Sequence, residues 1–186
     1  MKKIYFLIVF FGALLFCACE KENTDLLIED QTQLENGALK GAQAHGKNHH
    51  VPFKARFAQE QTDFNEGPPV YVEMEGLGNA SHLGKTNIWV GQYWEGDFPN
   101  LEGAADVVFT AANGDKLYAD LYAYNTIELV EMNGEWVPVF ASITGGGTFT
   151  GGTGRFLDAD GPYELSGYYD FLTGESEAFY TGEIMY

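Results

Sequence analysis

Cysteine is almost missing from this chain of 186 residues, which contains Cys17 and Cys19 and no other. Because both precede residue 20, a domain further along the chain has no thiol for a disulfide, for catalysis or for a thiolate metal site. An exported domain without disulfides depends on its hydrophobic core for stability. The cysteine pattern therefore excludes a disulfide scaffold and a cysteine enzyme.

Basic residues are scarce as well. The chain has 10 Lys and Arg against 27 Asp and Glu, which gives a formal net charge of -17. Such a surface repels phosphate backbones, so we expect no nucleic-acid partner. The same charge opposes docking on anionic lipid. Membrane attachment would then have to come from covalent acyl chains.

Long hydrophobic runs are limited to one, the 13 residues from Ile4 to Phe16, which follow "MKK". This length is short for a membrane span and typical of a signal peptide. Ala18 supplies the small residue before Cys19 that a signal peptidase requires, and the pattern resembles a bacterial lipobox with Phe16 in place of the usual Leu. We predict a signal peptide at 1–18 and lipidation of Cys19. An ordinary secretory signal and an N-terminal span are the alternatives.

Aromatic residues are absent between Glu20 and His50. We interpret 19–50 as a flexible acidic tether. The "EKE" that follows Cys19 resembles the acid-rich export signal of bacterial surface lipoproteins, which predicts an outer-membrane or cell-surface location. The histidines of "HGKNHH" lack a fourth ligand, so we expect a solvated linker and no metal site.

The composition changes at Val51, and the 136 residues that follow are rich in Tyr, Phe, Val, Thr and Gly. Short alternating segments between turn signals predict an all-β domain over 51–186. The expected strands are 53–57, 70–76, 85–94, 105–111, 116–124, 127–132, 135–143, 163–171 and 177–186. Hairpin turns are expected at Asn113-Gly114, Asn133-Gly134 and Thr173-Gly174. We predict eight or nine antiparallel strands closed into a barrel, which removes exposed edges; a flattened sandwich is the alternative.

The segment "SITGGGTFTGGTGRFLDADG", Ser142 to Gly161, is rich in glycine. A phosphate loop needs a lysine and a following helix, and a dinucleotide site needs a βαβ unit, so we expect no such cofactor. We interpret the glycines as bends around a short strand at 148–150, followed by a helical turn that points Phe156 inward. "DADG" lacks the glutamate that a calcium loop requires, which favours a turn at Asp158 to Asp160.

Aromatic residues follow two of the predicted strands at alternate positions. Trp89 and Tyr93 share one face of their strand, and Tyr118, Tyr122 and Tyr124 share one face of another. Such stripes are most often barrel core. The alternative is that Trp89, Tyr93, Tyr118 and Tyr122 bind a ligand, either in a cavity or as a platform on which sugars stack.

Polar candidates are few. We expect His82 in "SHLGK" to be structural, although a histidine could also titrate near neutral pH. Glu73 and Glu75 share a strand face about 7 Å apart, which fits a glycosidase pair only loosely and a solvated face well. No Ser-His-Asp order and no metal-ligand cluster stands out, so no catalytic residue is assigned.

Three motifs carry a family resemblance: "GNASHLGKTNIWV" at Gly78–Val90, "FTAANGDKLYADL" at Phe109–Leu121 and "SITGGGTFTGGTGRFLDADGPYELSG" at Ser142–Gly167. Together they resemble bacterial proteins of the allene-oxide-cyclase-like (dirigent-like) barrel group over most of 51–186. Ser81 departs from the commoner Thr, and "GGGTFT" lengthens the last motif. The resemblance implies an eight-stranded antiparallel barrel with a small hydrophobic cavity. It does not transfer the reaction of the plant cyclase, whose catalytic residues match no motif position here.

These observations favour a lipid-anchored extracytoplasmic barrel that needs no cofactor and binds a small apolar ligand or a glycan. The competing expectation is a cyclase or isomerase that acts inside the barrel. Such an enzyme needs a wet pocket with convergent polar groups, whereas an interior filled by Phe and Tyr would count against it. A structural or interaction protein would instead show an exposed apolar patch outside the barrel.

Overall fold

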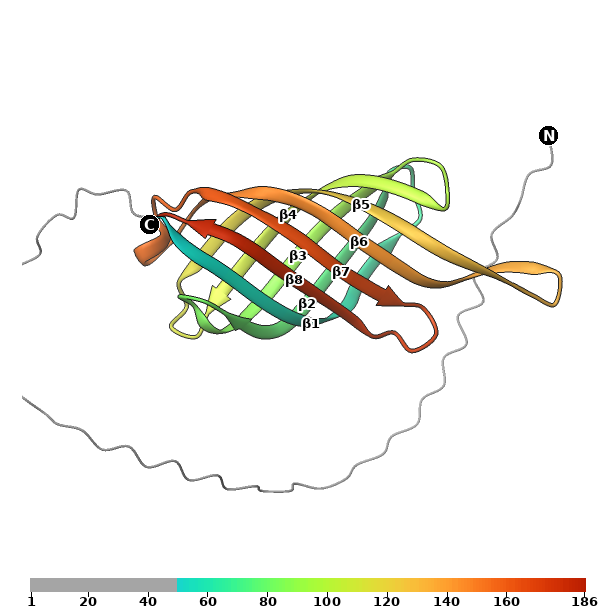
Figure 1. Cartoon of the computed structure of the whole chain (residues 1–186), viewed down its shortest axis with the longest axis horizontal. Coiled ribbons are helices and arrows are strands. Elements are labelled where there is room, and N and C mark those ends of the chain that lie inside the picture. The colour runs from blue at the N-terminus through green and yellow to red at the C-terminus, as the bar shows by residue number, and fades with distance from the viewer. Residues whose placement is uncertain (1–49) are drawn as a thin grey trace, which may run out of the picture. The chain divides into compact units, whose positions relative to one another are not determined.

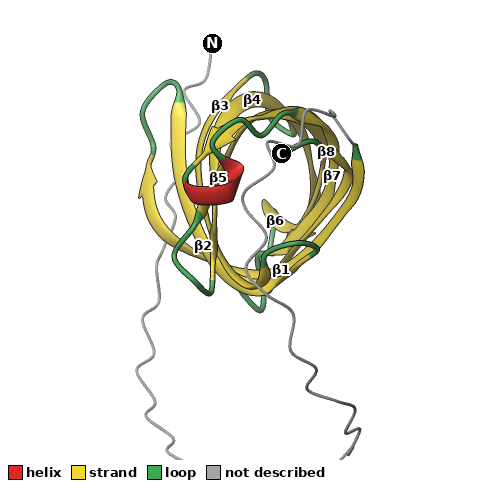
Figure 2. Cartoon of the chain, turned by 90° about the vertical axis from the view of Figure 1, so that its left-hand side faces the viewer, coloured by secondary structure: helices red, strands yellow, loops and turns green. Residues whose placement is uncertain are grey.

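The computed structural model describes residues 50–186; the predicted signal peptide, Cys19 and the tether up to residue 49 lie outside them. The described chain is all-β, and β8 pairs with β1 to close a barrel of eight antiparallel strands (Figures 1 and 2). The elements are β1 (Val51–Asn65), β2 (Val70–Ala80), β3 (Gly84–Glu95), β4 (Asn100–Ala111), β5 (Lys116–Met132), β6 (Glu135–Gly152), the 3-10 turn η1 (Gly154–Phe156), β7 (Gly161–Asp170) and β8 (Ser176–Ile184). The barrel prediction is confirmed, and closure rules out the flattened sandwich.

The three predicted hairpin turns are present. Gly114 and Gly174 have φ values of 89° and 76°, and the Asn133-Gly134 pair has 55° and 86°. These left-handed conformations suit Gly and Asn, which is why the turn residues locate the hairpins in the sequence. No helix in residues 50–186 is long and apolar enough to cross a membrane.

Two strands each join segments that were predicted as separate strands. The expected strands 116–124 and 127–132 form the single strand β5, and 135–143 runs on through 148–150 as β6. The pairing of β5 with β6 continues through the expected gap, where Asn125 and Thr126 pair with Ile143 and Ser142. The predicted breaks are therefore wrong, and the barrel has eight strands rather than nine.

The glycine run of β6 stays extended instead of bending. A Cβ at Gly145 would lie 2.4 Å from the carbonyl oxygen of Tyr122, and one at Gly147 would lie 1.8 Å from that of Asp120. These glycines therefore let the neighbouring strand approach closely. A positive φ occurs later in β6, at Gly151 (112°), where the register between β5 and β6 shifts.

Large rings fill the interior at the end of the barrel where β8 ends, which we call the plugged end. Each of these side chains is at most 3 % exposed: Phe53, Phe57, Phe109, Phe149, Phe156, Tyr163 and Tyr180. Ring centroids of contacting pairs among these residues lie from 4.8 Å (Phe53–Phe149) to 6.3 Å (Phe109–Phe149) apart, and the ring of Phe156 contacts that of Tyr186 at 5.1 Å. Phe156 comes from η1, which Figure 2 shows at this mouth. The prediction that Phe156 points inward is confirmed.

At the opposite end, the β5–β6 hairpin extends past the other strands as an arm (Figure 1). The β4–β5 ladder ends at Thr126 and the β6–β7 ladder begins at Phe140. Beyond them the arm exposes Val130, Met132 and Trp136, the last at 64 %. Trp136 pairs with Glu131, so it lies on the opposite face of the arm from Val130 and Met132, and each face exposes apolar side chains.

Candidate binding surface on the outer face

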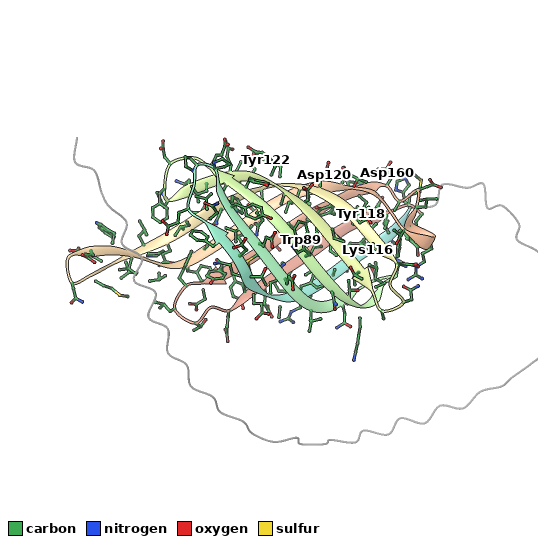
Figure 3. The ribbon with its side chains drawn as sticks, turned by 180° about the vertical axis from the view of Figure 1, so that it is seen from behind. Trp89, Lys116, Tyr118, Asp120, Tyr122 and Asp160 are labelled. Atoms are coloured by element: carbon green, nitrogen blue, oxygen red, sulfur yellow. The ribbon has the colours of Figure 1, made fainter. Side chains whose placement is uncertain are left out.

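The predicted ligand-binding aromatics lie on the outer face of the barrel. Tyr93 is 51 %, Tyr122 47 % and Tyr118 37 % exposed, while Trp89 is half-buried. Figure 3 shows Trp89, Tyr118 and Tyr122 on the side of β3 to β5. The interpretation of these stripes as barrel core is therefore wrong. In β3 the inward positions belong to Ile88, Val90, Gln92 and Trp94, which leaves the alternate residues outside.

Strand register brings the separate stripes together. Tyr71 pairs with Tyr93, Tyr93 pairs with Ala104, and Ala104 pairs with Tyr122, so these residues form one row across β2 to β5. The rings of Tyr71 and Tyr93 have centroids 4.8 Å apart, and those of Tyr122 and Tyr124 lie 5.6 Å apart. We call the outward rings of these strands the aromatic face: Tyr71, Trp89, Tyr93, Tyr118, Tyr122 and Tyr124.

Small residues shape this face. Ala104 lies between Tyr93 and Tyr122, and its small side chain leaves a shallow depression between the two exposed rings. A Cβ at Gly91 would lie 2.7 Å from the indole of Trp89 and 3.1 Å from the hydroxyl of Tyr71. The indole therefore packs over the backbone of Gly91, and any larger residue there would displace it.

The tyrosine hydroxyls of the face interact with carboxylates. Tyr71 Oη donates a hydrogen bond to Glu73 Oε1 at 2.5 Å. This bond, then burial and the charge of Glu73, raise the pKa of Tyr71 to about 12. Burial and a hydrogen bond with Glu102 raise the pKa of Tyr122. Acidic side chains share the outward parity of the rings: Glu73, Glu75, Glu95, Glu102, Asp106 and Asp120.

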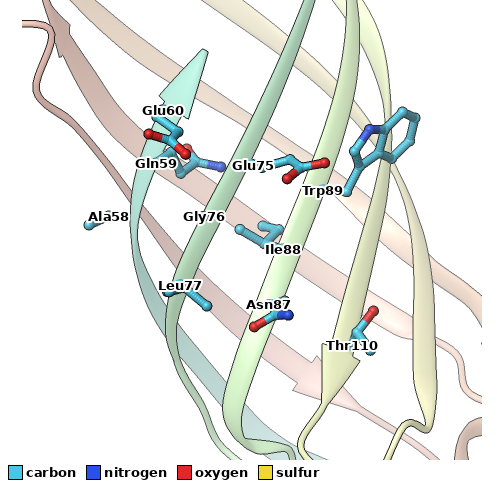
Figure 4. Close-up of a pocket in the computed structure, with 10 residues that line it drawn as sticks. All are labelled: Ala58, Gln59, Glu60, Glu75, Gly76, Leu77, Asn87, Ile88, Trp89 and Thr110. Carbon is cyan, nitrogen blue, oxygen red and sulfur yellow. The ribbon is translucent and has the colours of Figure 1, made fainter. Parts of the chain in front are cut away.

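A groove of about 620 Å³ adjoins the aromatic face over β1 to β4 (Figure 4). Glu60 is paired with Glu75, and Glu75 with Trp89, so these residues form one row along it. Figure 4 shows Glu75 between Glu60 and the indole. The next row supplies Leu77, which is 69 % exposed, with Asn87 and Thr110. The groove thus combines an aromatic wall, an aliphatic floor and polar groups.

Most groove residues were missed by sequence reasoning. The predicted first strand ends at Phe57, whereas β1 continues to Asn65 and carries Glu60. Lys54 and Arg56 alternate with buried residues, and the same alternation continues along β1 to Ala58 and Glu60. This alternation is the sequence signal that could have placed Glu60 on the outer face.

The barrel interior offers few titratable groups. Among the described residues that are buried, only Tyr163 and Tyr180 titrate, and burial raises the pKa of both. Tyr163 donates a hydrogen bond to the carbonyl oxygen of Asp120 at 2.6 Å. Towards the arm, Gln92 and Ser176 are buried, and Asn125 Oδ1 is a buried atom without a hydrogen-bond partner. Thr86, the third buried polar residue, lies at the plugged end, so buried polar groups occur towards both ends of the barrel.

His82 has the structural role that we expected. Its Nε2 lies 3.0 Å from the carbonyl oxygen of Pro52, and its own carbonyl oxygen accepts a hydrogen bond from Arg155. Arg155 also forms an ion pair with Asp115, with 4.0 Å between Nε and Oδ2. His82 thereby links the β2–β3 turn to β1 and to η1.

The remaining acidic candidates are dispersed. The predicted turn is present at Leu157 and Asp158, where the amide of Ala159 donates a hydrogen bond to the carbonyl oxygen of Phe156 at 3.0 Å. Asp160 follows the turn and forms a bridge with Met185, and its Oδ1 accepts a hydrogen bond from the amide of Gly161 at 2.7 Å. Glu73 binds Tyr71, whereas Glu75 lines the groove. Within residues 50–186, no group of three or more His, Cys, Asp or Glu side chains could hold a metal ion. His45 and His49 lie outside these residues.

No family model, no curated protein and no solved structure matches this chain.

Proposed function

We propose that this protein is a lipid-anchored extracytoplasmic barrel that binds a glycan on its aromatic face. The observation that carries the proposal is the row of exposed rings across β2 to β5, in which Tyr93 and Tyr122 leave about half of their surface in water. A sugar ring has an apolar face of C–H groups, and an exposed aromatic ring with a polar tip offers it both stacking and a hydrogen bond. Tyr93 and Tyr122 are two strand spacings apart, about 10 Å, so one oligosaccharide could contact both.

A glycan fits these positions better than a small apolar ligand does. An apolar ligand would need an apolar cavity, and the plugged end of the barrel is occupied by packed rings. The candidate aromatics, by contrast, line a water-exposed face flanked by carboxylates and by a groove. Carboxylates accept hydrogen bonds from sugar hydroxyls without a change of charge.

The binding proposal can be tested on the purified protein in which Cys19→Ser prevents lipidation. A panel of neutral and charged oligosaccharides should yield at least one ligand, and Tyr93→Ala and Tyr122→Ala should each weaken its binding about tenfold, since central aromatic contacts contribute more than about 1 kcal/mol. Trp136→Ala is the matched control, because this exposed ring lies on the arm and should leave affinity unchanged. An empty panel, or equal loss in the control, would refute the proposal.

The competing function is a cyclase or isomerase that acts inside the barrel. What favours it is the group of polar residues near the arm, Gln92, Asn125 and Ser176, with one buried oxygen unpaired. Against it stands the interior of the plugged end, which packed Phe and Tyr rings fill. Native mass spectrometry distinguishes the two functions: an interior ligand should be retained by the Tyr93→Ala variant, whereas a ligand of the outer face should be lost.

The location and the family relationship are parts of the same proposal. The eight-stranded barrel is the architecture that the resemblance to the allene-oxide-cyclase-like group implies. The anchor rests on the sequence from Ile4 to Cys19. Replacement Cys19→Ser should release the protein from the membrane fraction and abolish incorporation of labelled palmitate. Labelling of the variant would refute the assignment of Cys19.

A further inference from the structure

We infer that the groove beside the aromatic face selects glycans that carry a protonated amine, such as oligomers of an unacetylated amino sugar. This inference rests on the proposed glycan binding and adds the substrate class to it. The groove is the place where an aromatic wall and two carboxylates meet: Trp89, Glu75 and Glu60 occupy one row on three adjacent strands (Figure 4).

Glu60 and Glu75 are direct cross-strand partners, which places their Cβ atoms about 4.5–5.5 Å apart. Like charges in this position repel each other and destabilise the sheet. The ion pairs among residues 50–186 use other carboxylates, those of Asp115, Glu177 and Glu183. No basic side chain of the described residues therefore neutralises this pair, and a ligand cation bound between the carboxylates would relieve the repulsion.

The indole of Trp89 adds to the attraction for a cation. Trp89 is the neighbour of Glu75 across the ladder, and its ring is held over the backbone of Gly91. An ammonium group at an indole face gains cation–π attraction in addition to its interaction with a carboxylate. A sugar that bears the amine can place its C–H face against the same ring or against Leu77.

The opposite side of the groove suits the rest of a sugar. Asn87 and Thr110 are cross-strand partners that present an amide and a hydroxyl, both of which donate and accept hydrogen bonds. Leu77 leaves an aliphatic surface between them and β1. This combination recognises hydroxyls as well as charge, which separates a glycan amine from a simple ammonium ion.

Charge also determines what the groove rejects. The chain carries a net charge of -17, so uronates and sulfated glycans are repelled before they reach the groove. A neutral N-acetylated sugar escapes repulsion but gains nothing from Glu60 and Glu75. Acetylation of a single nitrogen is therefore the change that the groove should discriminate.

The experiment compares glucosamine oligomers with N-acetylglucosamine oligomers of equal length, by calorimetric titration of the Cys19→Ser protein. We expect the amine form to bind at least tenfold more tightly at low salt, with a preference that falls as salt is raised because the exposed charges are screened. Glu75→Gln and Glu60→Gln should each reduce the preference several-fold. The matched control is Glu164→Gln, which removes one negative charge from an exposed position of β7 and should keep the preference.

The outcomes separate the two proposals. Equal affinity for both oligomers, or an equal loss in Glu164→Gln, overturns the inference about the groove while the aromatic face still binds glycans. If no oligosaccharide of any class binds, the proposed function itself fails. Thermal unfolding gives an independent readout: without ligand, Glu75→Gln should raise Tm because it removes the like-charge pair, and a lowered Tm would contradict the arrangement on which the inference depends.

Discussion

The rings inside the plugged end and the rings of the aromatic face belong to the same barrel, but they come from different strands and differ in how far the protein covers them. Phe53, Phe57 and Phe109 are fully buried, whereas Tyr93 and Tyr122 are about half exposed. Burial of apolar area contributes about 25 cal/mol per Å² to folding, so the inner set stabilises the barrel and the outer set contributes much less. We therefore expect the stability of the fold to depend much less on the outer rings than on the inner ones.

The two sets also differ in what surrounds them. Inside, rings contact other rings, and Phe109 lies within 6.3 Å of four of them by centroid distance. Outside, Tyr71 and Tyr122 are hydrogen-bonded to the carboxylates of Glu73 and Glu102. Packing fixes the inner rings, while polar partners orient the outer ones and leave their faces accessible.

The largest effect that separates the two sets is expected for Phe109→Ala. The variant removes a fully buried ring at the centre of the aromatic plug, and such deletions cost about 3–5 kcal/mol. Urea unfolding followed by near-UV circular dichroism measures the loss. Phe109→Leu keeps most of the volume and should lose less. A cost below about 1 kcal/mol for the alanine variant would mean that the plug can collapse or that it is not packed as described.

A smaller cost is expected for Gly147→Ala, which adds one methyl group on the inner side of β6. The new Cβ would lie 1.8 Å from the carbonyl oxygen of Asp120 and 2.9 Å from the hydroxyl of Tyr163. These two atoms are joined by a hydrogen bond, which the methyl group would disturb. Overpacking of this kind costs about 1–3 kcal/mol by chemical denaturation. Gly114→Ala is not an equivalent control, because Gly114 has a positive φ; Gly146→Ala, which meets a single atom at 3.0 Å, should cost less.

Much of this fold could be predicted from local chemistry. Gly114 and the Asn133-Gly134 pair have left-handed backbone that suits their residue types, and alternation identifies the strands between these turns. The run Gly145–Gly147 was misread because glycine permits both a bend and a close approach of chains. The choice between a bend and a close approach depends on β5 and β7, which flank this run in the barrel and are distant in the sequence.

The candidate site was predictable only in part. Alternation shows that Trp89 and Tyr93 share a face, but it does not show whether that face is inside or outside. Tyr has both an apolar ring and a polar tip, so its presence is compatible with either side. The groove depends on the pairing of Glu60 with Glu75, which are 15 positions apart and whose register no local pattern fixes.

Alkaline pH should destabilise the barrel through its buried tyrosines. Burial raises the pKa of Tyr180 above its ordinary value near 10, so its stabilising contribution is complete below about pH 10 and is lost as the pH rises beyond it. Each such group steepens the loss by up to about 1.4 kcal/mol per pH unit. The free energy of unfolding of Tyr180→Phe should therefore fall less than that of the unsubstituted protein as the pH rises above 10. Denaturant midpoints at pH 8 and pH 11 measure the difference. An equal slope in both proteins would contradict the burial of this hydroxyl.

The smallest effect is expected for Tyr93→Ala on the aromatic face. The ring is half exposed and contacts Tyr71 across the β2–β3 ladder, and such cross-strand pairs contribute about 0.2–1 kcal/mol. The free energy of unfolding should therefore change by less than about 1 kcal/mol, even though the variant removes as large a ring as Phe109→Ala does. Tyr93→Phe keeps the ring contact and should cost still less. If Tyr93→Ala destabilised the barrel as much as Phe109→Ala, the outer rings would be structural, and their exposure would no longer support a role in glycan binding.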